Sequence, residues 1–405
     1  MFPKRFRTRL IIAAIAAVMP AAALAAEDVS TLRQEVEQLK REVQELRQIL
    51  KTQKEAAKPA TQEEIADLRK EVAKAQSEWK DPVSTKHFAG YADVGYTDSR
   101  KATGTFSTAR FNPGFHYQYA DLVLVDAELE LAVTPAGKTE TALEFTTVNV
   151  LLNDYAALFA GKFLSPIGQF RQNLHPSWIN KLPSAPTGFG HDQGAPTSEV
   201  GAGLRGGAPI GGMGFNYAVY VGNGPRLELN GAGDEIEMIE SEGAVSNPSG
   251  KKVWGTRIGL RPIPKLEVGV SGALGKVVVE SEPTRSYSVA GADAAYQWRN
   301  LDLRAEYVRQ KVGDLAVSVA PMGGAWRAWY GQAAYRFAAT KWETVLRYGK
   351  YTTPHLDQDQ KQWAVGLNYV FTPNLVGKVA YEFNKGLAGT PLDDDRLLLQ
   401  ISYGF

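Results

Sequence analysis

The last ten residues of the chain, RLLLQISYGF at positions 396 to 405, alternate with a period of two. Successive side chains of a β-strand point to opposite faces, so this period predicts a strand with two unlike faces. One face carries Leu397, Leu399, Ile401, Tyr403 and Phe405, and the other carries Leu398, Gln400, Ser402 and Gly404. A face fit for lipid opposite a face fit for water is typical of the strands of a membrane β-barrel.

The same period of two runs from position 82 to the C-terminus. We therefore expect residues 82 to 405 to form an all-β, sixteen-stranded antiparallel transmembrane β-barrel. The expected strands are 86–97, 105–118, 121–134, 138–149, 154–163, 198–208, 212–222, 251–262, 265–276, 287–298, 301–312, 326–338, 341–352, 361–371, 375–385 and 396–405.

The connections between these segments alternate in length. The even-numbered ones are short turns, whereas the odd-numbered ones include the long stretches 164–197 and 223–250. Short turns on one side and long loops on the other are the layout of an outer-membrane barrel. Aromatic residues near the expected strand ends are predicted to lie at the membrane interfaces: Phe88, Tyr96, Tyr155, Phe163, Tyr348, Trp363, Phe371, Tyr381 and Phe405.

The N-terminus has the pattern of a secretory signal peptide. Four basic residues between positions 4 and 9 precede the apolar stretch from Leu10 to Val18, and Ala23-Leu24-Ala25 offers a small-x-small cleavage site. The sequence therefore predicts a signal peptide over residues 1–25 and export from the cytoplasm.

Residues 26–81 are predicted to form an α-helical coiled coil in the periplasm. The seam repeats at spacings of three and four residues, with Arg and Lys at the e positions and Glu at g: Val29, Leu32, Val36, Leu39, Val43, Leu46 and Leu50. A single amphipathic helix on the protein's own surface is the alternative. The seam predicts an oligomer, and the choice between two and three strands stays open.

Composition excludes several classes of protein. The chain has 405 residues, 45 Lys and Arg against 44 Asp and Glu, and no Cys. A formal charge of +1 lacks the basic excess of a protein that neutralises many phosphates, so no nucleic-acid partner is expected. Beyond the N-terminus no apolar run approaches the roughly 18 residues of a spanning helix.

Catalytic and metal-binding patterns do not stand out in the sequence. The histidines are scattered over expected strand starts and loops: His87, His116, His175, His191 and His355. No spacing suits a metal-binding helix, and no Gly-x-Ser-x-Gly elbow occurs. We therefore expect no enzyme activity, no cofactor and no metal site.

Charged residues on the polar strand faces are expected to separate into two walls of the lumen. Acidic residues gather on the third and fourth strands: Asp126, Glu128, Glu130, Glu140 and Glu144. Basic residues are spread over later strands: Arg205, Arg257, Arg261, Arg304, Arg336, Arg347 and Lys378. Such walls would set a transverse field across a water-filled lumen. The alternative is that these charges are solvated or paired, for instance Glu343 with Arg347.

The third outward connection, residues 164–197, is long and rich in Pro and aromatic residues. Long structured loops are usually functional or packed, so we expect this one to fold inward and narrow the channel. An ordered external lid or a trimer-contact latch is the alternative. The pore and constriction candidates are Arg171, His175, Lys181, His191, Asp192, Arg257, Arg304, Glu128 and Glu144. With Arg171 and Lys181 against Asp192, an inward loop predicts a weak anion preference.

Several stretches resemble the trimeric porins of Gram-negative outer membranes, and within them the phosphate-selective porin O/P group and related coiled-coil-bearing porins. They are Gly161-Lys162-Phe163-Leu164-Ser165-Pro166, His175-Pro176-Ser177-Trp178, Tyr220-Val221-Gly222-Asn223-Gly224-Pro225 and the terminal Phe405. The resemblance implies a homotrimer of sixteen-stranded barrels, an inward third loop, and assembly machinery that recognises a C-terminal aromatic residue.

Two functions follow as hypotheses. The first is a porin in the outer membrane of a Gram-negative bacterium, surrounded by lipid, through which small solutes or anions diffuse passively. The alternative is a structural anchor whose coiled coil tethers the envelope by binding a periplasmic or cell-wall partner.

Overall fold

The computed structural model describes Lys70, residues 84 to 279 and residues 281 to 405. The chain divides into two units, Met1–Lys80 and Asp81–Phe405, and the second contains every strand described here. The expected signal peptide at 1–25 lies outside the described residues, as does the expected coiled coil at 26–81 apart from Lys70.

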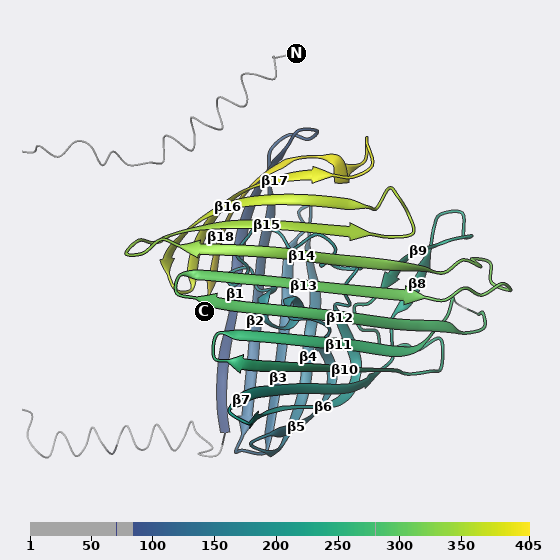
Figure 1. Cartoon of the computed structure of the whole chain (residues 1–405), viewed down its shortest axis with the longest axis horizontal. Coiled ribbons are helices and arrows are strands. Elements are labelled where there is room, and N and C mark those ends of the chain that lie inside the picture. The colour runs from purple at the N-terminus through teal and green to yellow at the C-terminus, as the bar shows by residue number, and fades with distance from the viewer. Residues whose placement is uncertain (1–69, 71–83, 280) are drawn as a thin grey trace, which may run out of the picture. The chain divides into compact units, whose positions relative to one another are not determined.

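Sixteen antiparallel strands form one closed barrel in the second unit, as the period of two predicts (Figure 1). Their bounds are β1 (Ser84–Ser99), β2 (Thr105–Tyr119), β3 (Val123–Val133), β4 (Thr139–Asn153), β5 (Ala156–Leu164), β6 (Ser198–Ile210), β7 (Met213–Gly222), β10 (Val253–Ile263), β11 (Leu266–Val277), β12 (Arg285–Trp298), β13 (Leu301–Val312), β14 (Gly324–Arg336), β15 (Trp342–Thr352), β16 (Gln360–Thr372), β17 (Leu375–Lys385) and β18 (Arg396–Gly404). Each overlaps an expected strand. Among the described residues, no helix is long and apolar enough to cross a membrane.

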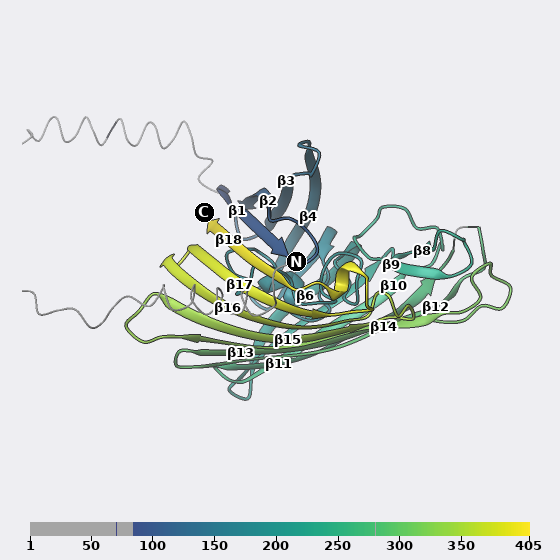
Figure 2. The ribbon, with the colours of Figure 1, turned by 90° about the horizontal axis from the view of Figure 1, so that it is seen from above.

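The barrel closes where β18 pairs with β1, and the two strands lie side by side (Figure 2). Two main-chain hydrogen bonds between Gly90 and Phe405, of 3.0 and 3.1 Å, extend this seam to the last residue. The faces alternate as expected, since Ile401 is 50% exposed on the outer wall whereas Ser402 is 1% exposed on the inner one.

The aromatic residues expected at the interfaces mostly lie on the outer wall, and Phe163 is the exception. Phe88, Tyr155 and Trp363 are each at least half exposed. Phe163 points inward and packs against Phe159, with the ring centroids 4.8 Å apart. The prediction for Phe163 is wrong because part of the barrel interior is dry and accepts apolar side chains.

The connections keep the expected alternation of short and long. In Figure 1 the short turns joining β10 to β15 in pairs lie at the left, and the longer connections lie at the right. The connection after β7 contains a hairpin of its own, β8 (Arg226–Leu229) and β9 (Ile236–Glu240), which forms a separate two-stranded sheet.

The third outward connection, between β5 and β6, enters the barrel. It begins with a short π-helix, η1 (Phe170–Leu174), and contributes Phe170 and Phe189 to the largest buried apolar cluster. Tyr330 of β14 belongs to the same cluster, with its ring centroid 5.1 Å from that of Phe189. Apolar burial therefore fixes the loop against the inner wall.

Candidate pore constriction

Loop 3, defined as residues 165–197, is attached to inward-facing side chains from its first residues. The Gly168 N–H donates to the Ser271 hydroxyl on β11 at 3.2 Å, and the Phe170 N–H donates to Glu306 Oε2 on β13 at 3.0 Å. Gly168 has a φ of +73°, a backbone conformation that favours glycine. A Cβ built on Gly168 would lie 1.7 Å from Glu306 Oε1, so the close approach also requires glycine.

The middle of loop 3 is attached to the next strands around the barrel. The Lys378 ammonium on β17 and the Ser402 hydroxyl on β18 both donate to the main-chain oxygen of Ser177. The Asn368 side chain on β16 donates to the main-chain oxygen of Lys181 at 2.8 Å.

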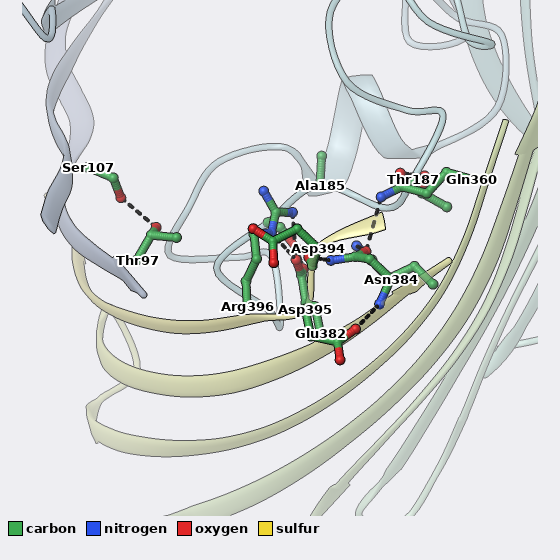
Figure 3. Close-up of polar contacts among 12 residues, drawn as sticks. Thr97, Ser107, Ala185, Thr187, Gln360, Glu382, Asn384, Asp394, Asp395 and Arg396 are labelled. Atoms are coloured by element: carbon green, nitrogen blue, oxygen red, sulfur yellow. Dashed lines mark hydrogen bonds and ion pairs between the residues drawn. The ribbon is translucent and has the colours of Figure 1, made fainter. Parts of the chain in front are cut away.

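Further along, loop 3 joins a polar network on β15 to β18. The Arg347 guanidinium donates to the Ser184 main-chain oxygen at 3.0 Å and to the Ala185 main-chain oxygen at 3.1 Å. The Ser184 hydroxyl donates to Glu382, which also pairs with Arg396 at 2.6 Å (Figure 3). These contacts with strands around the barrel confirm that the loop folds inward, which excludes the external lid and the latch.

A cavity of about 410 Å³ lies between loop 3 and the wall formed by the first strands. Its charged side chains and histidines are Arg110 of β2, Glu130 of β3, Glu144 of β4, and Arg171, His175 and His191 of loop 3. The structure thus brings Glu144 and three of the loop candidates together. Sequence reasoning missed Arg110, although its place on the expected second strand, opposite Asp93, was a usable signal.

Arg171 is 6% exposed, and its Nε and Nη2 atoms have no hydrogen-bond partner in the described part of the chain. Its guanidinium carbon lies 6.0 Å from the centroid of the Phe170 ring. Burial lowers the pKa of Arg171, and the nearby negative charge of Glu144 opposes that shift. An arginine remains charged at neutral pH despite such a shift, so the cavity wall carries a buried positive charge.

His175 connects loop 3 to the acidic wall on β3. Its Nδ1 donates to the Arg171 main-chain oxygen at 2.5 Å, and its Nε2 lies 3.6 Å from Glu128 Oε1. The Tyr91 hydroxyl on β1 also reaches Glu128, at 3.4 Å. Glu128 therefore lies in contact with loop 3.

The remaining loop candidates are held by other partners. Lys181 pairs with Glu343 of β15 at 2.8 Å, so the suggested pair of Glu343 with Arg347 is wrong. His191 bonds to Glu242 beyond β9, and the Asp192 carboxylate accepts from the Ser241 N–H at 3.3 Å. The hydrogen bond from His191 lowers the pKa of Glu242, whereas burial raises the pKa of Asp192.

Arg257 and Arg304 form ion pairs with acidic side chains of the barrel wall. Arg257 pairs with Asp293 of β12 at 2.6 Å, and Arg304 pairs with Asp302 on its own strand at 2.7 Å. The structure does not bring these two side chains to the cavity beside β1 to β4. The opposing basic wall is therefore largely paired, as the alternative interpretation held.

A second cavity, of about 460 Å³, lies between loop 3 and strands β14 to β17. Four basic residues and a single carboxylate line it: Lys181, Arg336, Lys341, Lys378 and Glu343. Lys341, in the turn before β15, was not among the candidates, because a charge in a short turn looks like ordinary surface.

Comparison with solved structures identifies the architecture. The barrel is similar to OmpF of Salmonella typhi in its complex with daunomycin (TM-score 0.57, 13% identity, 80% of this chain and 99% of that chain). It is also similar to the outer membrane channel DcaP of Acinetobacter baumannii (TM-score 0.55, 11% identity, 80% and 99%). The anion-selective porin from Comamonas acidovorans is a third (TM-score 0.53, 13% identity, 80% and 100%).

Comparison by sequence gives no match: neither a protein-family model nor a curated protein matches the chain. At such low identity the structural likeness establishes the fold alone. Residues 84 to 405 therefore have the sixteen-stranded barrel fold of outer-membrane porins.

Proposed function

We propose that this chain is a porin of a Gram-negative outer membrane, through which small solutes diffuse without chemical change. The observation that carries the proposal is the cavity of about 410 Å³ left between the inward loop 3 and the charged wall of the closed barrel. A sixteen-stranded barrel is wider than its own side chains can fill, so its lumen is water-filled wherever the loop does not pack. The proposal includes no catalysis and no cofactor.

The proposed channel has a weak preference for anions. Charges of both signs line the cavity beside β1 to β4, whereas the second cavity carries four basic residues against Glu343 alone. Confinement between low-dielectric walls strengthens local fields, so this excess favours anions. The Comamonas acidovorans porin, which shares the fold, is anion-selective.

The proposal also covers the processing and oligomeric assembly of the chain, which rest on the sequence analysis. We propose that residues 1–25 are removed as a signal peptide, that residues 26–81 form a periplasmic coiled coil, and that three chains associate as a homotrimer. Envelope tethering through the coiled coil remains the alternative function. Deleting residues 27–81 discriminates the two, because a channel keeps its conductance without them whereas a tether loses envelope integrity.

Single-channel recording in planar lipid bilayers tests the channel function directly. The purified full-length protein is expected to give stepwise ohmic current in potassium chloride, and a small anion preference in the reversal potential across a salt gradient. High salt should weaken the preference because it shortens the Debye length. A folded, inserted protein that carries no current at any voltage would refute the proposal.

A charge reversal in loop 3 tests the constriction assignment. Replacing Arg171→Glu and Lys181→Glu together should change the preference from anions to cations, because both residues line the cavities beside the loop. Lys385→Glu, at the exposed end of β17, is the matched control and should leave the sign unchanged. A reversal potential unaffected by the double substitution would place loop 3 outside the conduction path.

A further inference from the structure

Two opposite charges on the wall of the cavity beside β1 to β4 are left unpaired. Arg171 of loop 3 and Glu144 of β4 are 6% and 8% exposed, and both line the cavity. They form no ion pair with each other. Among the described residues, no hydrogen bond or ion pair is found for the Glu144 carboxylate, and the Nε and Nη2 atoms of Arg171 have no hydrogen-bond partner.

The neighbouring charges of the cavity differ, because each has a partner. Arg110 pairs with Asp93 at 3.0 Å and with Glu130 at 3.6 Å, and His191 bonds to Glu242. Burying an unpaired charge is costly, and a nearly buried polar group without a partner requires an explanation. The two unpaired groups have opposite signs and line the same space, so a single solute can satisfy both.

We propose that this cavity binds zwitterionic solutes of the amino-acid class, with the solute carboxylate on Arg171 and its ammonium group on Glu144. The inference rests on the proposed channel function and names the solute class of that channel. A guanidinium suits a carboxylate because its N–H groups can donate in parallel, and a carboxylate accepts readily from an ammonium group. At roughly 30 Å³ for each water, the cavity has room for about a dozen waters, which is ample for such a solute.

A weaker alternative is that the pair only sets a local field in a water-filled passage. The two cases predict different responses to removing one charge. A field that merely selects by sign affects a solute according to its net charge, which is zero for a zwitterion. A site that holds both ends of the solute is weakened by removal of either charge.

The test uses three solutes of similar length: 4-aminobutyrate, which is a zwitterion, glutarate, which is a dianion, and 1,4-diaminobutane, which is a dication. Initial rates of exchange of labelled solute into proteoliposomes are measured at low concentration for the wild type, Arg171→Gln and Glu144→Gln. Glu140→Gln, at an exposed position of the same strand as Glu144, and Arg327→Gln, at an exposed position of β14, are the matched controls.

We expect both cavity variants to slow 4-aminobutyrate exchange by about tenfold or more, the loss expected for one hydrogen bond to a charged group. The two ions should respond oppositely, because Arg171→Gln slows glutarate and Glu144→Gln slows 1,4-diaminobutane. The exchanged pair, Arg171→Glu with Glu144→Arg, restores both charges and should recover 4-aminobutyrate exchange. The control variants should match the wild type.

Two results would overturn the inference. One is 4-aminobutyrate exchange unaffected by either cavity variant, and the other is 4-aminobutyrate exchange that, like glutarate exchange, is slowed by Arg171→Gln but not by Glu144→Gln. Conductance in potassium chloride is recorded for every variant, which shows that each one folds. Normal conductance without the zwitterion response refutes this inference alone, whereas absent conductance in the wild type refutes the channel function.

Discussion

The Arg347 guanidinium on β15 donates to the main-chain oxygen of Ser184, 3.0 Å away and 163 residues earlier in the chain. The same guanidinium bonds to the Ser184 hydroxyl at 2.8 Å and lies 3.8 Å from Glu382. Arg347 is 1% exposed, so loop 3 is fixed to the wall by a charge that is shielded from water. This contact fixes the middle of loop 3 to the wall formed by β15 to β18.

Replacing Arg347→Gln should therefore release the middle of loop 3. Removing one partner of a buried charged network costs about 3–5 kcal/mol, here concentrated on the loop because the strand pairing is unaffected. We expect a noisier channel with a different single-channel conductance. Arg205→Gln, which removes an arginine bonded to Asn149 on the wall, is the control and should keep wild-type current noise. Identical noise in both variants would contradict the anchoring role.

Gly168→Ala should loosen the beginning of loop 3. The residue has a φ of +73°, and its new Cβ would displace the Glu306 carboxylate that accepts from Phe170. Gly137→Ala is a close control, with a φ of +75° and no atom within 4 Å of its Cβ, so both variants share the left-handed strain of about 1–2 kcal/mol. Trypsin should cut the loop of Gly168→Ala several-fold faster than that of Gly137→Ala. Equal cleavage rates would show that the contact with Glu306 is dispensable.

The strands were predictable because their signal is local. A period of two is set by the geometry of each strand alone, and Ile401 beside Ser402 shows it without reference to the rest of the chain. The attachment of loop 3 was not predictable, since Lys181 meets Glu343 across 162 residues. Glu343 and Arg347, the suggested pair, lie four residues apart on β15, a separation of roughly 13 Å along a strand.

The burial of Phe163 was not predictable from the sequence either, because it also depends on tertiary contacts. Phe163 was assigned to the outer wall because an apolar side chain in a porin strand usually faces lipid. Loop 3 makes part of the interior dry, and Phe163 and Phe170 belong to the apolar cluster there. Alternation along β5 cannot reveal this, because the loop that covers Phe163 packs by tertiary contacts.

The contact between loop 3 and the β8–β9 hairpin should depend on pH. The hydrogen bond from His191 lowers the pKa of Glu242 below its usual value near 4.5. A carboxyl with a lowered pKa stabilises the fold fully above its unfolded pKa, and this contribution is lost as pH falls through the folded pKa. Asp192 acts with the opposite sign, because burial and Glu242 raise its pKa and protonation relieves that penalty.

Carbon-13 titration of the Glu242 carboxyl measures this effect. The midpoint should lie below 4.5 in the wild type and rise toward that value in His191→Gln. His355→Gln is the control, since His355 approaches Glu235 at 3.7 Å and leaves Glu242 untouched. A midpoint that does not move in His191→Gln would show that another group sets the pKa of Glu242.

Phe405→Ala should weaken the closing seam of the barrel. The Phe405 ring stacks on Phe88 and Phe111 of β1 and β2, with centroid separations of 5.6 and 5.7 Å. Aromatic pairs contribute about 0.5–1.5 kcal/mol each beyond the area they bury, so losing both costs about 1–3 kcal/mol. Phe337→Ala removes an exposed ring that pairs with the ring of Tyr335, two residues earlier in the chain, and controls for lost lipid contact. Urea unfolding of the barrel in lipid vesicles should show a larger loss for Phe405→Ala, because its ring joins three strands across the seam. Equal losses would mean that the main-chain bonds between Gly90 and Phe405 close the barrel unaided.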